Sequence, residues 1–136
     1  MTTTEPPARL AIAQAFVLHL GHLDVEQVAK LLSPTVTYRV PGSYGLAGTF
    51  HGPDEVTRHL MALAERTRGT FDAFKWEDWM VGQDYVSILA DIRMQIERRI
   101  FSGRVIFLVG FDNHNKISTL GVFYEDMHAI ERFFGT

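Results

Sequence analysis

Residues 85–124 read YVSILADIRMQIERRIFSGRVIFLVGFDNHNKISTLGVFY, and this stretch decides the fold. Apolar and polar residues alternate across Tyr85–Ile100, which is the pattern of a strand with one buried face. Arg104–Phe111 is apolar on both faces, so we expect a central strand that is covered on both sides. Lys116–Tyr124 predicts a third strand. We expect turns at Phe101–Gly103 and Asp112–Asn115, and such short connections make neighbouring strands antiparallel.

The composition is that of an ordinary soluble chain, and it excludes several classes of function. The length of 136 residues suits one domain, residues 1–136, with a real core, and we expect residues 1–7 to be disordered. A net charge of −3 gives no basic surface for nucleic acid. The absence of cysteine excludes disulfides and thiol catalysis. We find no membrane-spanning run and no signal peptide, and we expect a cytoplasmic protein.

The remaining segments alternate between helical and strand patterns. We predict helices at Ala8–Leu20, Asp24–Leu32, Pro53–Arg66 and Asp126–Phe134. We predict strands at Thr35–Val40, Leu46–His51 and Phe71–Val81. The third helix should bury a stripe formed by Val56, Leu60, Leu63 and Ala64. Helices that are segregated from an antiparallel sheet indicate the α+β class, and a strongly curved sheet around a long helix would form a cone with a cavity at its open end.

Four segments resemble, in order and spacing, motifs of one superfamily. They are GHLD at Gly21–Asp24, TVTYRVPG at Thr35–Gly42, LAGTFHGPDEV at Leu46–Val56 and FDNHNKI at Phe111–Ile117. They resemble the cone-shaped α+β fold of nuclear transport factor 2 (NTF2), which ketosteroid isomerase, limonene epoxide hydrolase and the SnoaL polyketide cyclases share. The combination of VPG with LAGTFHG is most similar to the SnoaL-like, ketosteroid-isomerase-related bacterial branch.

The resemblance to ketosteroid isomerase does not extend to its catalytic groups. Its base aspartate lies in the first strand, where this chain has Tyr38 and Arg39. The position of its oxyanion-hole aspartate falls on Phe107, and that of its oxyanion tyrosine falls near Gln14. The steroid isomerase reaction is therefore not supported.

Limonene epoxide hydrolase uses an Asp-Arg-Asp set, and one of its three members is matched. One aspartate aligns with Asp91, whereas the arginine position falls on Leu89 and the second aspartate on or near Val122. Arg93 lies two residues from Asp91, on the same face of the predicted strand. One interpretation places this pair inside the cone as a base and its orienting guanidinium. The alternative is an outer, solvated face with a weak salt bridge.

The candidate site consists of three catalytic residues and of further residues that line the cavity and contact substrate. Asp91 is the expected base, Arg93 orients it, and Tyr38 donates a hydrogen bond to a substrate oxygen. We predict that substrate contacts Phe16, His19, His51, Trp76, Leu89, Phe107 and Val122. Trp76 and Trp79 should point to opposite faces of their strand, so at most one lines the cavity. The six histidines show no metal-binding spacing, and we expect no metal and no cofactor.

Two functions remain open. The first is an enzyme that acts on a small apolar, oxygenated molecule by cofactor-free acid–base chemistry, as an isomerase, cyclase, dehydratase or epoxide hydrolase. The second is a non-catalytic, ligand-binding or structural dimeric module.

A homodimer follows from the strands that are apolar on both faces. Helices can cover only one side of a single sheet, and the other side would leave a patch larger than soluble monomers usually expose. Bacterial relatives of this fold commonly bury that face against a second copy, so the resemblance implies the same arrangement. We therefore predict a two-fold homodimer, sheet to sheet, with Ile106 and Leu108 near its centre.

Overall fold

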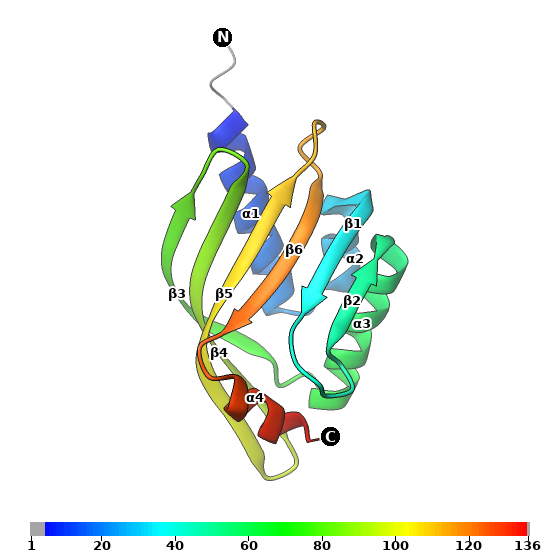
Figure 1. Cartoon of the computed structure of the whole chain (residues 1–136), viewed down its shortest axis with the longest axis vertical. Coiled ribbons are helices and arrows are strands. Elements are labelled where there is room, and N and C mark those ends of the chain that lie inside the picture. Colours follow the sequence, from blue (N-terminus) through cyan, green and yellow to red (C-terminus); the bar gives the residue numbers. More distant parts are fainter. Residues whose placement is uncertain (1–4, 136) are drawn as a thin grey trace.

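The computed structural model describes residues 5–135, which form four helices and six strands (Figure 1). The helices are α1 (Glu5–Gly21), α2 (Val25–Leu31), α3 (Gly52–Thr67) and α4 (Met127–Phe134). The strands are β1 (Leu32–Val40), β2 (Gly48–His51), β3 (Asp72–Val81), β4 (Tyr85–Ile96), β5 (Arg99–Phe111) and β6 (Ile117–Tyr124). Residues 5–7 lie within α1, against the expected disorder, and residues 1–4 lie outside the described part of the chain.

The six strands form one mixed sheet in the order β2-β1-β6-β5-β4-β3. Neighbouring strands are antiparallel except for β1 and β6, which run parallel. The expectation of a fully antiparallel sheet is wrong at this one pair. Its physical reason is that no short turn joins β1 to β6, so the chain is free to return in either direction.

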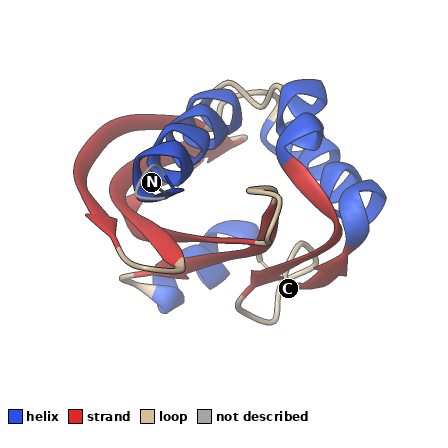
Figure 2. Ribbon diagram, turned by 90° about the horizontal axis from the view of Figure 1, so that it is seen from above, coloured by secondary structure: helices blue, strands red, loops and turns tan. Residues whose placement is uncertain are grey.

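The sheet curves around α1 and α3, which lie against its concave side (Figure 2). In α3, the predicted stripe is buried at Val56 and Leu60 and half-buried at Leu63 and Ala64. One hydrophobic core lies between these helices and the sheet. The α4 helix lies across the lower end of the sheet in Figure 1, beside the loop between β1 and β2.

The turn between β4 and β5 differs from the prediction. Ile96 pairs with Arg99, so the chain reverses at Glu97 and Arg98, and Glu97 adopts the positive φ of 54° that a tight turn needs. Gly103 lies inside β5 because the Phe101 ring covers it: a Cβ at residue 103 would lie 2.8 Å from Phe101 Cζ. This glycine serves close packing in a strand and does not make a turn.

The two tryptophans of β3 point to the same side of the sheet, which corrects the prediction. Trp76 pairs with Ala90 and Trp79 with Ile88, and both partners face the core. The register shifts between Trp76 and Asp78, so Glu77 is an extra, bulged residue. The bulge cancels the alternation, and the two rings lie 6.5 Å apart between centroids.

Candidate functional site

Strict alternation along β4 decides which residues face the interior. Ile88, Ala90 and Ile92 are fully buried, whereas Asp91 is half-exposed and Arg93 is exposed. Asp91 pairs across the sheet with Lys75 and Arg104, so it belongs to the outer face. The placement of Asp91, Arg93 and Leu89 inside the cone is therefore wrong, and the outer-face alternative holds. The resemblance implied the inner face for Asp91, and a register difference of one residue is enough to exchange the two faces of a strand.

A small cavity lies between α3 and the concave side of the sheet. Four polar side chains line it: Tyr38 of β1, Tyr44 of the β1–β2 loop, His59 of α3 and Tyr124 of β6. Its apolar walls include Leu20, Leu46, Met94, Phe107, Val122 and Phe134. We call this space the inner cavity. None of its described lining residues is Asp, Glu, Lys or Arg. The volume of the cavity that the centre of a water molecule can occupy is about 20 Å³. A single ordered water requires about 10–15 Å³ on that measure.

His59 is the titratable group at the centre of this cavity. The side chain is only 6% exposed, and its Nδ1 atom has no hydrogen-bond partner among the described residues. Its ring lies edge-on to Tyr38, with centroids 5.3 Å apart, and 4.5 Å from the Phe50 centroid. Burial lowers the pKa of His59 to about 4, because the apolar surroundings disfavour the charged ring. His59 is therefore neutral at pH 7 and can accept a proton or a hydrogen bond.

The three tyrosines present hydroxyl groups to the same space. Burial raises the pKa of Tyr44 to about 12 and also raises the pKa values of Tyr38 and Tyr124 well above their ordinary value, so all three are neutral donors at pH 7. Tyr44 and Tyr124 influence each other's pKa, although their geometry falls short of a hydrogen bond. The buried Tyr44 hydroxyl therefore lacks a partner among the described residues.

Three of the residues chosen from the sequence meet in the inner cavity: Tyr38, Phe107 and Val122. The other predicted contacts lie elsewhere. Phe16 is buried in the core on α1, one turn before the cavity-lining Leu20. His19 and Trp76 are half-buried outside the lining, and His51 is exposed at the start of α3, where its Nδ1 lies 3.5 Å from Thr37 Oγ1.

Sequence reasoning missed His59, Tyr44 and Tyr124. A signal existed for His59, because it follows Val56 by three residues and thus falls in the buried stripe of α3. Tyr124 also continues the inward-facing alternation of Leu120 and Val122. Tyr44 gave no local signal. It lies in a loop, and its ring reaches the cavity by stacking on Phe134, with centroids 4.7 Å apart.

The site offers hydrogen bonding and proton transfer. Within residues 5–135, no group of three or more histidine or acidic side chains is placed to hold a metal ion.

No helix of the described chain is both long and apolar enough to cross a membrane.

Comparisons of sequence find mycobacterial relatives. The chain is 30% identical over 113 residues to the uncharacterised protein Rv0034 of Mycobacterium tuberculosis (strain H37Rv), covering 82% of this chain and 84% of that protein. The uncharacterised protein Mb0035 of Mycobacterium bovis matches with the same identity and coverage. No protein-family model matches the sequence.

Comparisons of structure confirm the predicted fold. A Xanthomonas campestris protein of unknown function with a cystatin-like fold superposes with a TM-score of 0.87 at 23% identity, over 94% of this chain and 98% of that one. An NTF2-like protein of Burkholderia xenovorans gives 0.78 at 17% identity, over 93% and 95%. A Catenulispora acidiphila protein with a ketosteroid isomerase-like fold, in complex with trimethylamine, gives 0.73 at 13% identity, over 91% and 92%.

Proposed function

We propose that this chain binds a small, uncharged, mostly apolar molecule that carries an oxygen atom. The chain belongs to the same family as the mycobacterial protein Rv0034 and has the NTF2-like fold. We propose further that it acts on this molecule by cofactor-free acid–base chemistry. The observation that carries the proposal is the pair of unpartnered polar groups, His59 Nδ1 and the Tyr44 hydroxyl, in an otherwise apolar cavity.

Unpartnered buried groups are costly, and this cost favours a ligand. Each one destabilises a protein by about 1–3 kcal/mol relative to a satisfied group. A ligand oxygen placed between Tyr44 and His59 would supply the missing partner. The absence of charged side chains from the described lining favours an uncharged ligand, because an ion would lose its hydration without a counter-charge. The structural relative in complex with trimethylamine adds that this fold can hold a small molecule.

The reaction that suits these groups is proton abstraction next to a carbonyl group. In this scheme His59 takes a proton from the carbon beside the carbonyl, the electrons of that C–H bond form the C=C bond of an enolate, and the C=O π electrons move onto the oxygen. Tyr38 and Tyr44 donate hydrogen bonds to the oxygen as its charge develops. Return of the proton to carbon completes an exchange or isomerisation. A pKa of about 4 does not exclude His59 as the base, because the aspartate base of ketosteroid isomerase works with a pKa of about 4.6.

Hydrogen exchange into a simple ketone tests this proposal. We expect the protein to catalyse the exchange of the enolisable hydrogens of 1-indanone in D₂O, followed by NMR. His59→Gln should lower the catalysed rate by about 10²–10⁴-fold, the usual contribution of a general base. The matched control is Asp91→Asn, on the outer face, which should leave the rate unchanged. Equal rates in the wild-type protein and His59→Gln would remove His59 from the chemistry.

A second candidate is a binding protein without turnover. It is favoured by the lack of a carboxylate in the described cavity lining and by the weak basicity of His59. In that case 1-indanone would bind to the wild-type protein and Tyr44→Phe would weaken binding, but no exchange into the ketone would occur.

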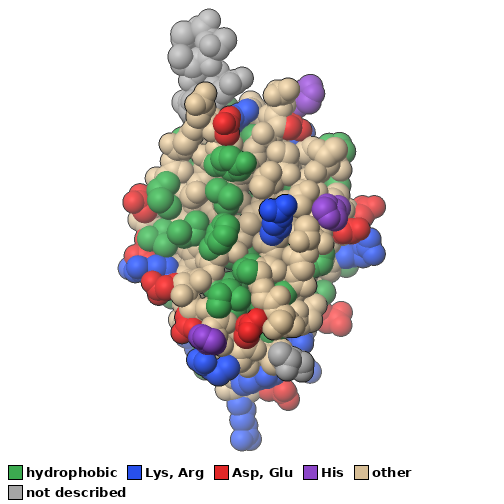
Figure 3. Space-filling model, viewed as in Figure 1, with side chains coloured by type: hydrophobic (Ala, Val, Ile, Leu, Met, Phe, Trp, Pro, Cys, Tyr) green, Lys and Arg blue, Asp and Glu red, His purple; other side chains and the backbone are tan. Residues whose placement is uncertain are grey.

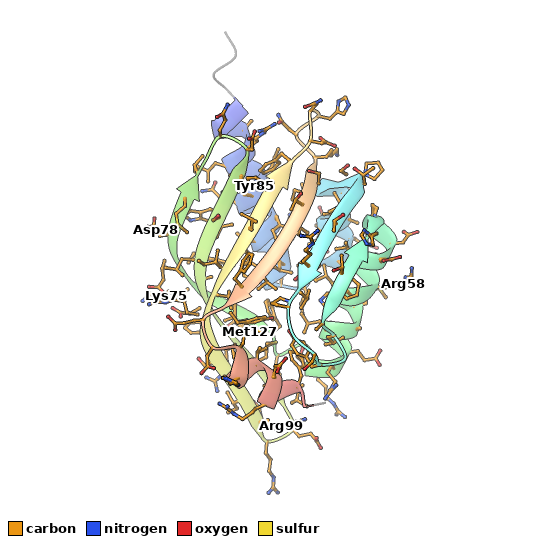
Figure 4. All side chains as sticks on the ribbon, in the orientation of Figure 1. Arg58, Lys75, Asp78, Tyr85, Arg99 and Met127 are labelled. Atoms are coloured by element: carbon orange, nitrogen blue, oxygen red, sulfur yellow. The ribbon has the colours of Figure 1, made fainter. Side chains whose placement is uncertain are left out.

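We also propose that the outer sheet face joins two copies of the chain. Hydrophobic side chains gather over the centre of this face (Figure 3). Cross-strand pairing aligns Leu89 with Ile106 and Phe123, and Phe123 is 56% exposed. We call the following side chains the outer patch: Met80, Tyr85, Leu89, Ile106, Leu108 and Phe123. Lys75 and Asp78 lie at its β3 edge, with Tyr85 over the upper sheet (Figure 4), which gives the apolar centre and polar rim of a protein interface.

A further inference from the structure

The inner cavity is nearly closed, although two open grooves lie beside it. The first, which we call the end groove, has a volume of about 1130 Å³ and includes Arg66, Thr70 and Gln95 in its walls. The second, which we call the side groove, has a volume of about 360 Å³ and includes Phe50 and Arg58. Figure 4 shows Arg58 projecting from α3 away from the sheet. The inner cavity itself has room for about one water, so a ligand as large as 1-indanone fits only when part of the lining moves outward.

Leu46 is the residue that the three spaces share. Its side chain lines the inner cavity, the end groove and the side groove, and it is half-buried. His59 lines both the inner cavity and the side groove, so the imidazole lies next to the same boundary. Leu46 therefore separates the inner cavity from the end groove, and together with His59 it separates the inner cavity from the side groove.

The loop that carries Leu46 is fastened at its middle and bordered by glycines. Glu131 Oε2 of α4 accepts hydrogen bonds from the Ser43 backbone N–H at 2.8 Å and from Ser43 Oγ at 3.0 Å. Tyr44 stacks on Phe134, also of α4. Gly42 and Gly48 have φ values of 122° and 146°, which L-residues rarely adopt. The loop is thus held to α4 by the Ser43 hydrogen bonds and by the buried Tyr44 ring, between two positions of high backbone freedom.

We infer that Leu46 is the gate of the inner cavity, and that ligands enter from the grooves when its side chain moves out of the boundary. This inference rests on the proposed function for the identity of the site, but it concerns access alone. A gate that is mostly closed lowers the apparent affinity by the fraction of molecules that are open. Removing the Leu46 side chain should therefore raise both the accessibility of His59 and the association rate of any ligand that fits.

Chemical modification of His59 measures access without a ligand. Diethyl pyrocarbonate reacts with accessible neutral imidazoles, and the modified peptides are quantified by mass spectrometry. We expect Leu46→Ala to raise the modification rate of His59 by about tenfold or more over the wild-type protein. The exposed His128 gives an internal reference. Met61→Ala is the matched control, since Met61 is 58% exposed on α3 and lines none of the three spaces.

A second variant guards against a folding defect in Leu46→Ala. Glu131→Ala removes the acceptor that holds Ser43, yet it leaves the cavity walls intact. It should also raise the His59 modification rate, by a smaller factor than Leu46→Ala does. A thermal melt of each variant checks that the fold is retained.

Stopped-flow fluorescence with 1-naphthol, a neutral and mostly apolar probe, separates the gate from the proposed function. Faster association with Leu46→Ala supports both. Faster modification of His59 without naphthol binding to any form supports the gate and counts against the proposed function. An unchanged His59 modification rate in both Leu46→Ala and Glu131→Ala overturns the gate, whether or not naphthol binds.

Discussion

The two faces of strands β4, β5 and β6 differ in kind, although they are built from alternate residues of the same segments. The inner face carries fully buried side chains such as Ile88 and Val109, and it ends at a cavity whose described polar groups are all uncharged at pH 7. The outer face carries the outer patch together with an ion pair between Arg104 Nε and Glu77 Oε2 at 3.2 Å.

The difference shows that charge and chemistry need not coincide. The Asp91 and Arg93 pair attracted attention because both are charged, but charged groups in a strand are most often solvated. His59 and Tyr44 carry no charge at pH 7, yet each has a buried polar atom without a partner among the described residues, which a ligand could supply.

The largest effect should come from packing on the inner face. Ile92 is 1% exposed on the inner face of β4, and its neighbour Arg93 is exposed on the outer face. Ile92→Ala should lower the free energy of unfolding by about 2–5 kcal/mol, because it leaves a cavity. Arg93→Ala should change it by less than about 0.5 kcal/mol. Urea unfolding of both variants checks this contrast, and equal effects would contradict the assigned register.

The α3 helix provides the same contrast from the other side of the core. Leu60 is 2% exposed against the sheet, and Met61 is 58% exposed. Leu60→Ala should cost about 2–5 kcal/mol of unfolding free energy, and Met61→Ala should cost less than about 0.5 kcal/mol. Denaturant midpoints measure both. A loss under about 1 kcal/mol for Leu60→Ala would mean that the helix does not pack as described.

The pH dependence of stability isolates His59. Its pKa in the folded chain, about 4, is below the ordinary value of 6.5, so the unfolded chain binds more protons between these pH values. Stability should therefore fall as the pH falls from 6.5 to 4, by about 3 kcal/mol from this group, and should not depend on His59 above pH 6.5.

Variants separate this histidine from the carboxyl groups that titrate nearby. The difference in unfolding free energy between the wild-type protein and His59→Gln should change across this window, as measured by urea unfolding at several pH values. His128→Gln, on exposed α4 surface, should follow the wild-type protein throughout. A constant difference between the wild-type protein and His59→Gln would show that His59 titrates normally.

A charge on the outer patch should act on assembly more than on the inner site. We expect the wild-type protein to be a dimer at micromolar concentration by light scattering. Leu108→Asp would bury an unpaired carboxylate in the interface, and it should weaken the dimer by at least about 100-fold. Ser102→Asp, on exposed β5 surface, serves as a control. A monomeric wild-type protein would remove the outer patch from this role.

The smallest effect should come from the residue that first suggested catalysis. Asp91→Asn, on the outer face, should leave ligand binding at the inner cavity unchanged and should shift the unfolding free energy by less than about 0.5 kcal/mol. Calorimetric titration with 1-indanone compares it with the wild-type protein. A large loss of binding would return Asp91 to the site.

Local patterns were sufficient for most of the fold. Alternation and helical stripes predicted every described helix and strand, because burial on one face imposes those periods, but the turn between β4 and β5 was misplaced and β5 begins at Arg99 instead of Arg104. The alternation of β4 also predicts the correct face for Asp91, since Ile88, Ala90 and Ile92 form the apolar side of the strand. The family alignment led away from it.

Other features could not be predicted, because they depend on contacts distant in sequence. The Glu77 bulge reverses the face of Trp79 without any glycine or proline to mark it. Gly103 resembles a turn residue until Phe101 is seen to cover it. Tyr44 becomes a cavity residue only through its contact with Phe134, on a helix at the other end of the chain.

The most direct test of the inner cavity as the functional site is an NMR titration of the imidazole nitrogens with 1-indanone. We predict that the His59 signals shift on binding while those of the exposed His51 and His128 do not. The Tyr44→Phe variant should show a smaller shift at the same ligand concentration. Binding of 1-indanone that leaves the His59 signals unchanged would contradict this account.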